Sequence, residues 1–367
     1  MRKFTGFEKG IGLGGWLTNY KRFHVLGNDK KKILTVGDYE HFNSFITEND
    51  VKNIAKMGFD HIRLGFDQVV VETENGEYRE EIFKLIDAFI GWCEKYSVNV
   101  VLNLHKSLGN YCDVVEDVSL LDNKDLQNRF KKLWVYIESR YLNKPQIAFE
   151  LLNELTVGSK DSWNKLAGET VAEIRALNKT RKIIIGGLSF NSVNSLKDIE
   201  VLDDENVIYT FHMYEPFEFT HQKGVLQQAT CFYNREMPYP CSDVERYRHF
   251  KREIRGVDNA YANYTEIGYD FIKDFLAPAK EFIKNNPNAI LWCGEFGTIR
   301  HANLEWRINW FKDVLRFFKE NEIPYSVWNY LSTPNDGNRF SLVDDDYRKI
   351  LSPKLLKVLL QKFYISL

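Results

Sequence analysis

Phe149-Glu150-Leu151-Leu152-Asn153-Glu154 is a short apolar run with a carboxylate at its carboxyl end. A second run of this kind, Leu291-Trp292-Cys293-Gly294-Glu295-Phe296-Gly297, occurs later in the chain. Continuous apolar runs of this length are typical of strands that are buried on both faces, as in a parallel sheet. We therefore expect two buried strands, each of which delivers one glutamate at its carboxyl end.

Short apolar runs alternate with longer amphipathic stretches along the rest of the chain. The expected strands cover residues 11–15, 61–66, 98–104, 147–152, 183–187, 207–211, 289–294 and 325–328. The expected helices cover residues 48–57, 80–96, 125–141, 162–177, 270–284, 304–320 and 353–363. This alternation predicts a parallel sheet with right-handed crossovers, and its eight strands predict closure into a (β/α)8 TIM barrel. We expect one catalytic domain over residues 1–367.

The regular spacing breaks once, after the sixth expected strand, where roughly sixty residues intervene before the next expected helix. This stretch is too aromatic to be disordered. Because an insertion after a barrel strand lies on the catalytic face, we expect residues 213–270 to form a lid or wall beside the substrate cleft. The alternative is a stabilising decoration far from the cleft.

The composition limits the classes of partner and the compartment. With 49 basic and 51 acidic residues, the chain has no general attraction to nucleic acid or to an acidic membrane surface. No run approaches membrane-spanning length, and residues 1–7 lack the apolar core of a signal peptide. The five cysteines have no Cys-x-x-Cys spacing and favour a reducing compartment. The chain as it stands is therefore expected in the cytoplasm, or outside the cell if a leader had been removed; its oligomeric state is not predicted.

Polar or aromatic side chains stand at the ends of the expected strands, where barrel enzymes carry their reactive groups. These are Arg63, His105, Asn153, Glu154, His212, Tyr214, Glu295 and Trp328. Cleavage of a glycosidic bond needs a proton donor and a second carboxylate that attacks the anomeric carbon or activates water. Arg63 and Tyr214 can keep one glutamate ionised, and His212 in a less polar setting can keep the other protonated. The aromatic content of 14% suits stacking against sugars.

Two other interpretations use parts of the same sequence. His105, Glu154, His212 and Glu295 could be metal ligands, but the chain has no His-x-x-x-His motif, so we expect no metal. The run Gly10-Ile11-Gly12-Leu13-Gly14-Gly15 matches G-x-G-x-x-G, but no apolar strand precedes it and no helical run follows it. A dinucleotide site is therefore not expected.

The chain resembles glycoside hydrolase family 5, the (β/α)8 retaining β-glycanases that include many cellulases. The resemblance runs from Gly12-Leu13-Gly14-Gly15-Trp16 through His61-Ile62-Arg63-Leu64 and Leu102-Asn103-Leu104-His105 to Val327-Trp328-Asn329. Within the family the chain is most similar to the clostridial endoglucanase C type, which carries an insertion after strand six. The string from Phe211 to Lys223 supports that placement.

The resemblance implies a role for each candidate residue. Glu154 would be the general acid/base and Glu295 the nucleophile. Arg63 and Tyr214 would position and ionise Glu295. The remaining roles concern the substrate: Asn153 would bind the sugar 2-hydroxyl, His105 and His212 would complete the polar shell, and Trp328 would form a platform under the sugar.

The resemblance also implies the substrate. The expected reaction is internal cleavage of β-1,4-glucan or mixed-linkage β-1,3-1,4-glucan, without a cofactor. Leu155 and Lys106 depart from the family pattern, and the second departure leaves the linkage preference open. The alternatives are an exo-acting β-glucanase or β-glucosidase on short oligosaccharides, or a β-mannanase. More distant alternatives are a metal-dependent barrel lyase or isomerase and an inactive carbohydrate-binding barrel.

Overall fold

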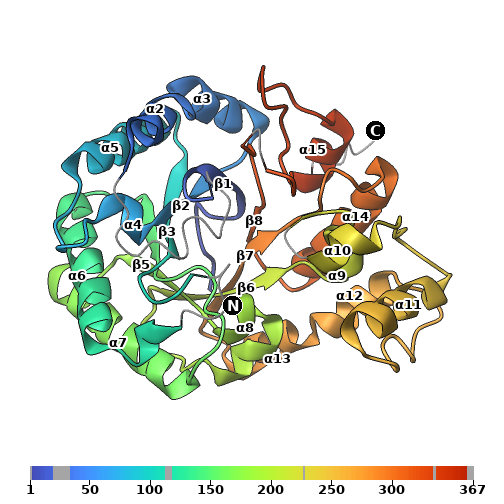
Figure 1. Ribbon diagram of the computed structural model, residues 1–367. Helices are drawn as coiled ribbons and strands as arrows, with labels where there is room; N and C mark the ends of the chain where they lie inside the picture. Colours follow the sequence, from blue (N-terminus) through green and yellow to red (C-terminus); the bar gives the residue numbers. More distant parts are fainter. Residues whose placement is uncertain (1, 20–33, 112–117, 226–227, 334–335, 362–367) are drawn as a thin grey trace, which may run out of the picture.

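The centre of the molecule is a closed barrel of eight parallel strands in chain order (Figure 1). The structure is a computed structural model, and it describes residues 2–19, 34–111, 118–225, 228–333 and 336–361. The strands are β1 (Lys9–Leu17), β2 (His61–Asp67), β3 (Asn99–Lys106), β4 (Ile147–Glu150), β5 (Lys182–Gly186), β6 (Val207–Met213), β7 (Ile290–Phe296) and β8 (Tyr325–Val327). Each strand pairs with its neighbours in sequence, and β8 returns to β1. The predicted (β/α)8 TIM barrel is confirmed.

Helices ring the barrel (Figure 1). They are α2 (Val36–Ser44), α3 (Glu48–Met57), α4 (Gln68–Val71), α5 (Glu80–Lys95), η1 (Ser119–Leu121), α6 (Lys124–Tyr141), α7 (Lys160–Leu177), α8 (Leu188–Asn191), η2 (Val193–Asp198), α9 (Phe217–Thr220), α10 (Gln228–Tyr233), α11 (Val244–Arg255), α12 (Tyr269–Phe275), α13 (Ala277–Asn285), α14 (Leu304–Glu320) and α15 (Pro353–Leu359). The main apolar core lies between this ring and the strands.

Several helices differ from the prediction, among them the short α4 and α8 and the helices α9 to α11, which were not expected. The single helix expected over 270–284 is divided into α12 and α13 at Leu276, because Pro278 lacks an amide hydrogen and stands in the first turn of a new helix. The helix α2 was not predicted from the sequence, and its apolar periodicity is weak. The last helix, α15, ends at Leu359 rather than at residue 363, which lies outside the described residues.

Glycines line the inner face of β1. A Cβ at Gly10 would lie 2.0 Å from the His61 ring, and Cβ atoms at Gly12 and Gly14 would each lie 2.6 Å from the Trp328 ring. Because alternate residues of a strand point the same way, these three glycines together make room for two rings inside the barrel. Packing thus accounts for Gly10 and Gly12 of the G-x-G-x-x-G pattern, and its third glycine, Gly15, has a φ of 77°.

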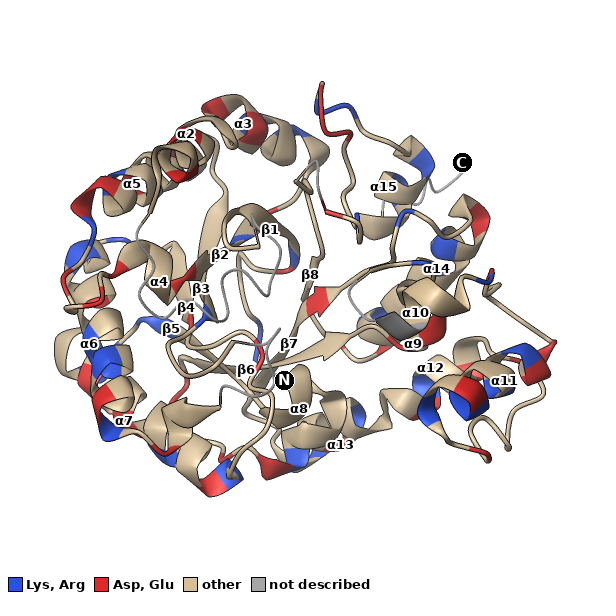
Figure 2. Ribbon diagram, viewed as in Figure 1, with Lys and Arg blue, Asp and Glu red and all other residues tan. Residues whose placement is uncertain are grey.

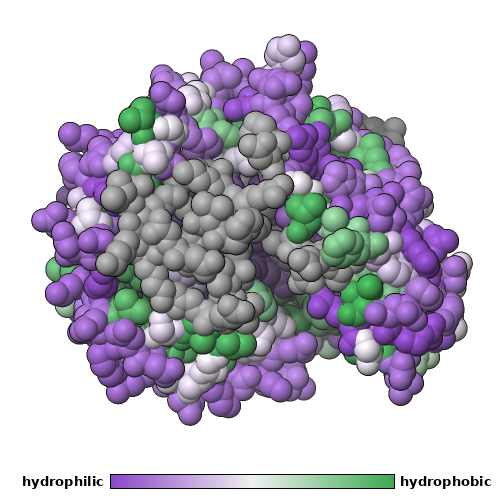
Figure 3. Space-filling model, viewed as in Figure 1, coloured by the Kyte–Doolittle hydropathy of each residue, from purple (hydrophilic) through white to green (hydrophobic). Residues whose placement is uncertain are grey.

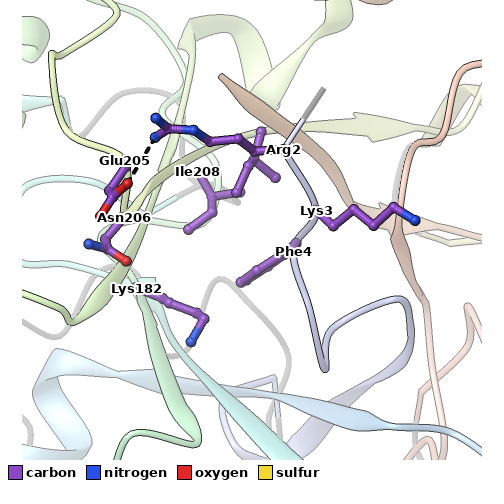
Figure 4. Close-up of a pocket in the computed structure, with 8 residues that line it drawn as sticks. Arg2, Lys3, Phe4, Lys182, Glu205, Asn206 and Ile208 are labelled. Carbon is purple, nitrogen blue, oxygen red and sulfur yellow. Dashed lines mark ion pairs between the residues drawn. The ribbon is translucent and has the colours of Figure 1, made fainter. Parts of the chain in front are cut away.

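A small apolar cluster closes the end of the barrel at which the strands begin. Phe4 and Phe7 stack with ring centroids 4.4 Å apart, and Phe4 meets Trp292 edge-on. A cavity of about 320 Å³ opens beside them (Figure 4), lined by Arg2, Lys3, Phe4, Lys182, Glu205, Asn206, Ile208 and Ile290. It lies opposite the carboxyl ends of the strands, so it is remote from the predicted site.

Basic and acidic residues alternate over the outer helices (Figure 2). No helix in the described part of the chain is both long and apolar enough to cross a membrane. The thiols of Cys93, Cys231, Cys241 and Cys293 are free, and Cys112 lies outside the described residues.

The region between β6 and β7 holds α9 to α13. The helices α9 and α10 lie beside β6 and β7, whereas α11 and α12 lie at the outer edge of the molecule (Figure 1). A buried carboxylate connects α9 to the outer helix α11. Glu218 of α9 accepts from Lys251 Nζ of α11 and from the Tyr261 hydroxyl, each at 3.0 Å. The lid or wall over residues 213–270 stays a prediction.

Candidate active site

A change of register in β7 turns Glu295 into the barrel. Trp292 packs inside the barrel against Phe4, whereas Phe296 packs outside it against Phe311 of α14. The pairing with β6 shifts between Phe211 and His212, so that His212 lies opposite Glu295. Irregularities of this kind re-aim side chains next to active sites. Glu295 is consequently buried at the carboxyl end of its strand.

Arg63 of β2 joins three acceptors in the barrel. Its Nε and Nη2 donate to both oxygens of Glu150, at 2.6 and 2.8 Å. Its Nη1 donates to Glu295 Oε1 at 2.5 Å, and Nη2 also donates to Asn153 Oδ1 at 2.6 Å. Burial tends to lower the pKa of Arg63, but the charges of Glu150 and Glu295 outweigh it and raise the pKa above its ordinary value. Arg63 is therefore a permanent cation, and its charge lies against Glu295.

The second oxygen of Glu295 accepts from a tyrosine. The Tyr214 hydroxyl donates to Glu295 Oε2 at 2.8 Å. Burial, together with the charges of Glu295 and Glu154, raises the pKa of Tyr214 well above its ordinary value. The hydroxyl therefore stays protonated and remains a donor. Each oxygen of Glu295 thus meets a donor, and the two hydrogen bonds fix the orientation of the carboxylate.

Glu154 follows β4 in a loop and is partly exposed. Its Oε1 lies 2.7 Å from Nδ1 of His212, which is itself 3.9 Å from Glu295 Oε2. One oxygen of Glu154, one of Glu295 and a ring nitrogen of His212 lie within 4.8 Å of one another. The two glutamates therefore lie close together at the carboxyl ends of the strands. Figure 3 views this face and shows a recess beside its centre.

His212 is neutral near pH 7. Burial lowers its pKa to about 4; Glu295 opposes this shift and Arg63 adds to it. A neutral imidazole carries a single N–H, so His212 donates through one ring nitrogen and accepts through the other. Its contact with Glu154 is accordingly a hydrogen bond rather than an ion pair.

The depressed pKa of His212 predicts a pH-dependent stability. The His212 ring has a pKa of about 6.5 in the unfolded chain and about 4 in the folded chain, so the unfolded chain takes up the proton first as the pH falls. The contribution of His212 to the free energy of unfolding is therefore complete above about pH 6.5 and is lost as the pH falls to about 4. The loss is on the order of 3 kcal/mol. Urea unfolding at several pH values should therefore give a shallower pH slope for His212→Gln than for the wild type. Equal slopes would contradict this account.

His105, Asn153 and Trp328 lie beside these groups and contact one another. The rings of His105 and Trp328 are nearly parallel, with centroids 5.6 Å apart. Asn103 Oδ1 lies 2.8 Å from His105 Nδ1, which assigns the ring proton to Nδ1 and leaves Nε2 to face Asn153 Nδ2 at 3.5 Å. Burial and the charge of Arg63 lower the pKa of His105 well below its ordinary value. Trp328 is half-buried and presents an apolar ring face beside these polar groups. All eight residues predicted for the site are therefore brought together.

A family model described as Cellulase (glycosyl hydrolase family 5) matches residues 26–333. The chain belongs to glycoside hydrolase family 5. It is therefore a glycoside hydrolase, and the resemblance drawn from its motifs is confirmed.

Two curated relatives align along most of the chain. Endoglucanase C of Acetivibrio thermocellus is 36% identical over 362 residues, which cover 98% of this chain and 99% of that protein. Cellodextrinase A of Ruminococcus flavefaciens is 30% identical and covers 88% and 85% of the two chains. A solved structure of a hyperthermophilic endo-β-1,4-glucanase with substrate superposes with a TM-score of 0.74, at 21% identity and 97% coverage of both chains. This last likeness supports the fold alone.

The family 5 site also contains groups that the sequence reasoning missed. Glu150 binds Arg63, Asn103 binds His105, and Asn191 lies against both Asn153 and His212. A signal existed for Glu150, because a charged residue inside an apolar strand is buried with a partner. Asn191 follows β5, for which no polar end group was expected.

Proposed function

We propose that the chain is a retaining endo-β-1,4-glucanase that cleaves β-1,4-glucan or mixed-linkage β-1,3-1,4-glucan by double displacement. The observation that carries this proposal is the approach of two carboxylates, since an oxygen of Glu154 and one of Glu295 lie within 4.8 Å. Retaining glycosidases hold their carboxyl groups about 5–5.5 Å apart, whereas inverting ones leave about 6.5–9.5 Å for a water molecule. The similarity to Endoglucanase C over 98% of the chain supports a glucan substrate.

In the first step Glu295 is the nucleophile. Its ionised oxygen, held by Arg63 and Tyr214, attacks the anomeric carbon and forms a glycosyl ester. The glycosidic C–O bond breaks at the same time, and Glu154 gives its proton to the departing oxygen. Because both donors to Glu295 are buried, the carboxylate is fixed and sheltered from water before the substrate arrives.

In the second step Glu154 acts as the base. Having lost its proton, it accepts a hydrogen bond from His212 Nδ1 and draws a proton from a water molecule that attacks the anomeric carbon. The ester to Glu295 breaks and releases the sugar with its original configuration. One carboxyl group thus serves as acid and then as base.

The remaining residues of the site position the sugar in this proposal. The amide of Asn153 reaches the cavity beside Arg63 and would bind the 2-hydroxyl, a contact that strengthens in the transition state. His105 adds a polar edge. The Trp328 ring would stack against the apolar face of the sugar at the cleavage point.

A second candidate is action on short oligosaccharides. It is favoured by the similarity to a protein named Cellodextrinase A. If residues 213–270 form a wall, one end of the cleft would be closed and products would leave from chain ends. A β-mannanase is a further possibility for the same catalytic pair. Product sizes distinguish these cases.

Glu154→Gln should lower activity on unactivated glucan by about 10²- to 10⁴-fold, because the amide cannot protonate the leaving oxygen. An aryl glycoside whose phenol leaves without protonation should form the glycosyl ester at a nearly unchanged rate. We would measure hydrolysis of carboxymethylcellulose, barley mixed-linkage glucan, laminarin, glucomannan and cello-oligosaccharides, with products sized. The exposed Glu200, changed in Glu200→Gln, provides a matched control.

The panel separates the candidate functions. Internal cuts in a β-glucan that disappear in Glu154→Gln support the endo-glucanase. Monosaccharide release from oligomers alone supports the second candidate. Loss of activity in a chelator would instead favour a metal held by Glu154, His212 and Glu295. Full activity of Glu154→Gln on unactivated glucan would contradict the acid/base assignment.

A further inference from the structure

The turn that follows β5 has an unusual backbone. Ser189, Phe190 and Asn191 have φ values of 55°, 61° and 52°, so three successive residues with a Cβ lie in the left-handed region. Residues other than glycine rarely adopt this conformation singly, and a run of three needs support from its surroundings. Backbone of this kind is concentrated at functional sites. The turn is α8, which packs beside β6 (Figure 1).

The support comes from the loop that carries Glu154. Ser189 N–H donates to the Thr156 carbonyl and Phe190 N–H to the Leu155 carbonyl, each at 3.0 Å. The side-chain amide of Asn191 donates to the Asn153 carbonyl. The left-handed turn therefore holds the backbone on both sides of Glu154.

The Asn191 amide also faces His212. Its Nδ2 lies 3.4 Å from His212 Nε2, and both residues are buried. The orientation of the amide is fixed, since Nδ2 faces the Asn153 carbonyl. Its Oδ1 packs against Gly186, so closely that a Cβ added to this glycine would lie 2.1 Å from the oxygen. An amide nitrogen only donates, so His212 Nε2 is the acceptor of the ring. The single ring proton therefore sits on Nδ1, where it is donated to Glu154 Oε1 at 2.7 Å.

We propose that Asn191 is a positioning residue for proton transfer: it holds His212 in the tautomer that donates to Glu154, and it fixes the loop that carries Glu154. This inference rests on the proposed acid/base role of Glu154. Asn191 does not touch the reacting atoms. It acts through His212, and its two amide hydrogens serve the two tasks.

Other charged or titratable groups surround His212 and must be counted in any pH effect. They are Arg63 of β2, His105 of β3, Glu150 of β4, Glu154 of the next loop, Tyr214 after β6 and Glu295 of β7. None of them changes in the variants described below. A difference in activity between variant and wild type therefore reports the two contacts of Asn191, and the ring ¹⁵N shifts report its contact with His212.

Two variants test the inference. Asn191→Gly removes the amide at a position whose positive φ glycine adopts without strain. His212 is then free to carry its proton on Nε2 and to present a lone pair to Glu154, which would hold its own proton more tightly. The alkaline limb of the pH profile of kcat/KM on cello-oligosaccharides should move up by about half a pH unit or more. We also expect kcat to fall about tenfold or more.

Asn191→Asp keeps the shape of the side chain but replaces the donor with an acceptor. Its carboxylate should draw a proton onto His212 Nε2. The measurement is the ¹⁵N shift of the ring nitrogens in protein labelled at histidine, with His212 assigned by its absence in His212→Gln. The wild type should show a protonated Nδ1 and a bare Nε2, and Asn191→Asp a protonated Nε2. The exposed Asn194, changed in Asn194→Ala, lies in the same segment and should alter neither readout.

The outcomes are distinguishable from failure of the proposed function. A proton on Nε2 in the wild type, or a bare Nε2 in Asn191→Asp, would overturn the tautomer assignment whatever the activity. If Glu154→Gln abolishes the alkaline limb of the pH profile but Asn191→Gly leaves it in place, the link between Asn191 and proton transfer is overturned. The proposed function would still stand. Full activity of Glu154→Gln would overturn the proposed function and leave the NMR result as the test of the contact.

Discussion

Glu295→Gln should lower kcat on a β-1,4-glucan by about 10⁴-fold or more, because a neutral amide does not attack the anomeric carbon. The fold should be kept. The amide oxygen can accept from Arg63 as the carboxylate does, and the Tyr214 hydroxyl can turn to accept from the amide nitrogen. Binding of oligosaccharide should therefore remain close to that of the wild type.

Kinetics on cello-oligosaccharides and calorimetric binding of the same ligands to Glu295→Gln measure the two halves of this prediction. Glu281→Gln, an exposed glutamate on α13, is the matched control and should retain full activity. Near-normal turnover by Glu295→Gln would exclude Glu295 as the nucleophile. Loss of binding together with turnover would mean that the residue holds the substrate rather than reacts with it.

Arg63→Met should destabilise the protein by about 3–5 kcal/mol, since it leaves two buried carboxylates without their cation. Glu150 loses both of its hydrogen bonds to Arg63, and Glu295 loses one. The folded fraction should also be nearly inactive, because Glu295 loses the donor that holds its attacking oxygen in place. Urea unfolding and activity well below the unfolding midpoint measure the two effects.

A second buried pair outside the site separates stability from catalysis. Arg181 Nε donates to Glu138 at 2.6 Å, and both side chains are buried. Arg181→Met should therefore be destabilised to a similar degree yet stay active while folded. Adding Glu150→Gln to Arg63→Met should restore part of the stability and none of the activity. Wild-type stability of Arg63→Met would show that Arg63 is not the counter-ion of the barrel.

The barrel could be predicted because each strand is a separate apolar run. The strand that carries Phe149 and the strand that carries Leu291 were recognised without knowledge of their neighbours. Helix α2 lacks a clear apolar period, and the division at Leu276 depends on a single proline, so neither left a strong pattern. The position of α11 and α12 depends on contacts such as the pair of Glu218 with Lys251, which spacing does not reveal.

A residue of the candidate site could be predicted when it stands at the carboxyl end of an apolar strand. Arg63, His105, His212, Glu295 and the pair Asn153-Glu154 all follow that rule. The contacts of Arg63 and Tyr214 with Glu295 were expected, but the register shift that turns Glu295 inward and the left-handed turn that ends in Asn191 could not be predicted. Both are backbone features without a periodic signature in the sequence. Arg63 pairs with two buried carboxylates, Glu150 and Glu295, and of these only Glu295 was expected as its partner.

The most direct test of the account is to trap the glycosyl ester. A 2-deoxy-2-fluoro cellobiosyl fluoride reacts when the nucleophile displaces fluoride, and the fluorine at C2 slows the hydrolysis that follows. Mass spectrometry of the digested protein should then find the fluorosugar on the peptide that carries Glu295. An adduct on Glu154, or an active enzyme that forms no adduct and releases the inverted anomer first, would contradict double displacement through Glu295.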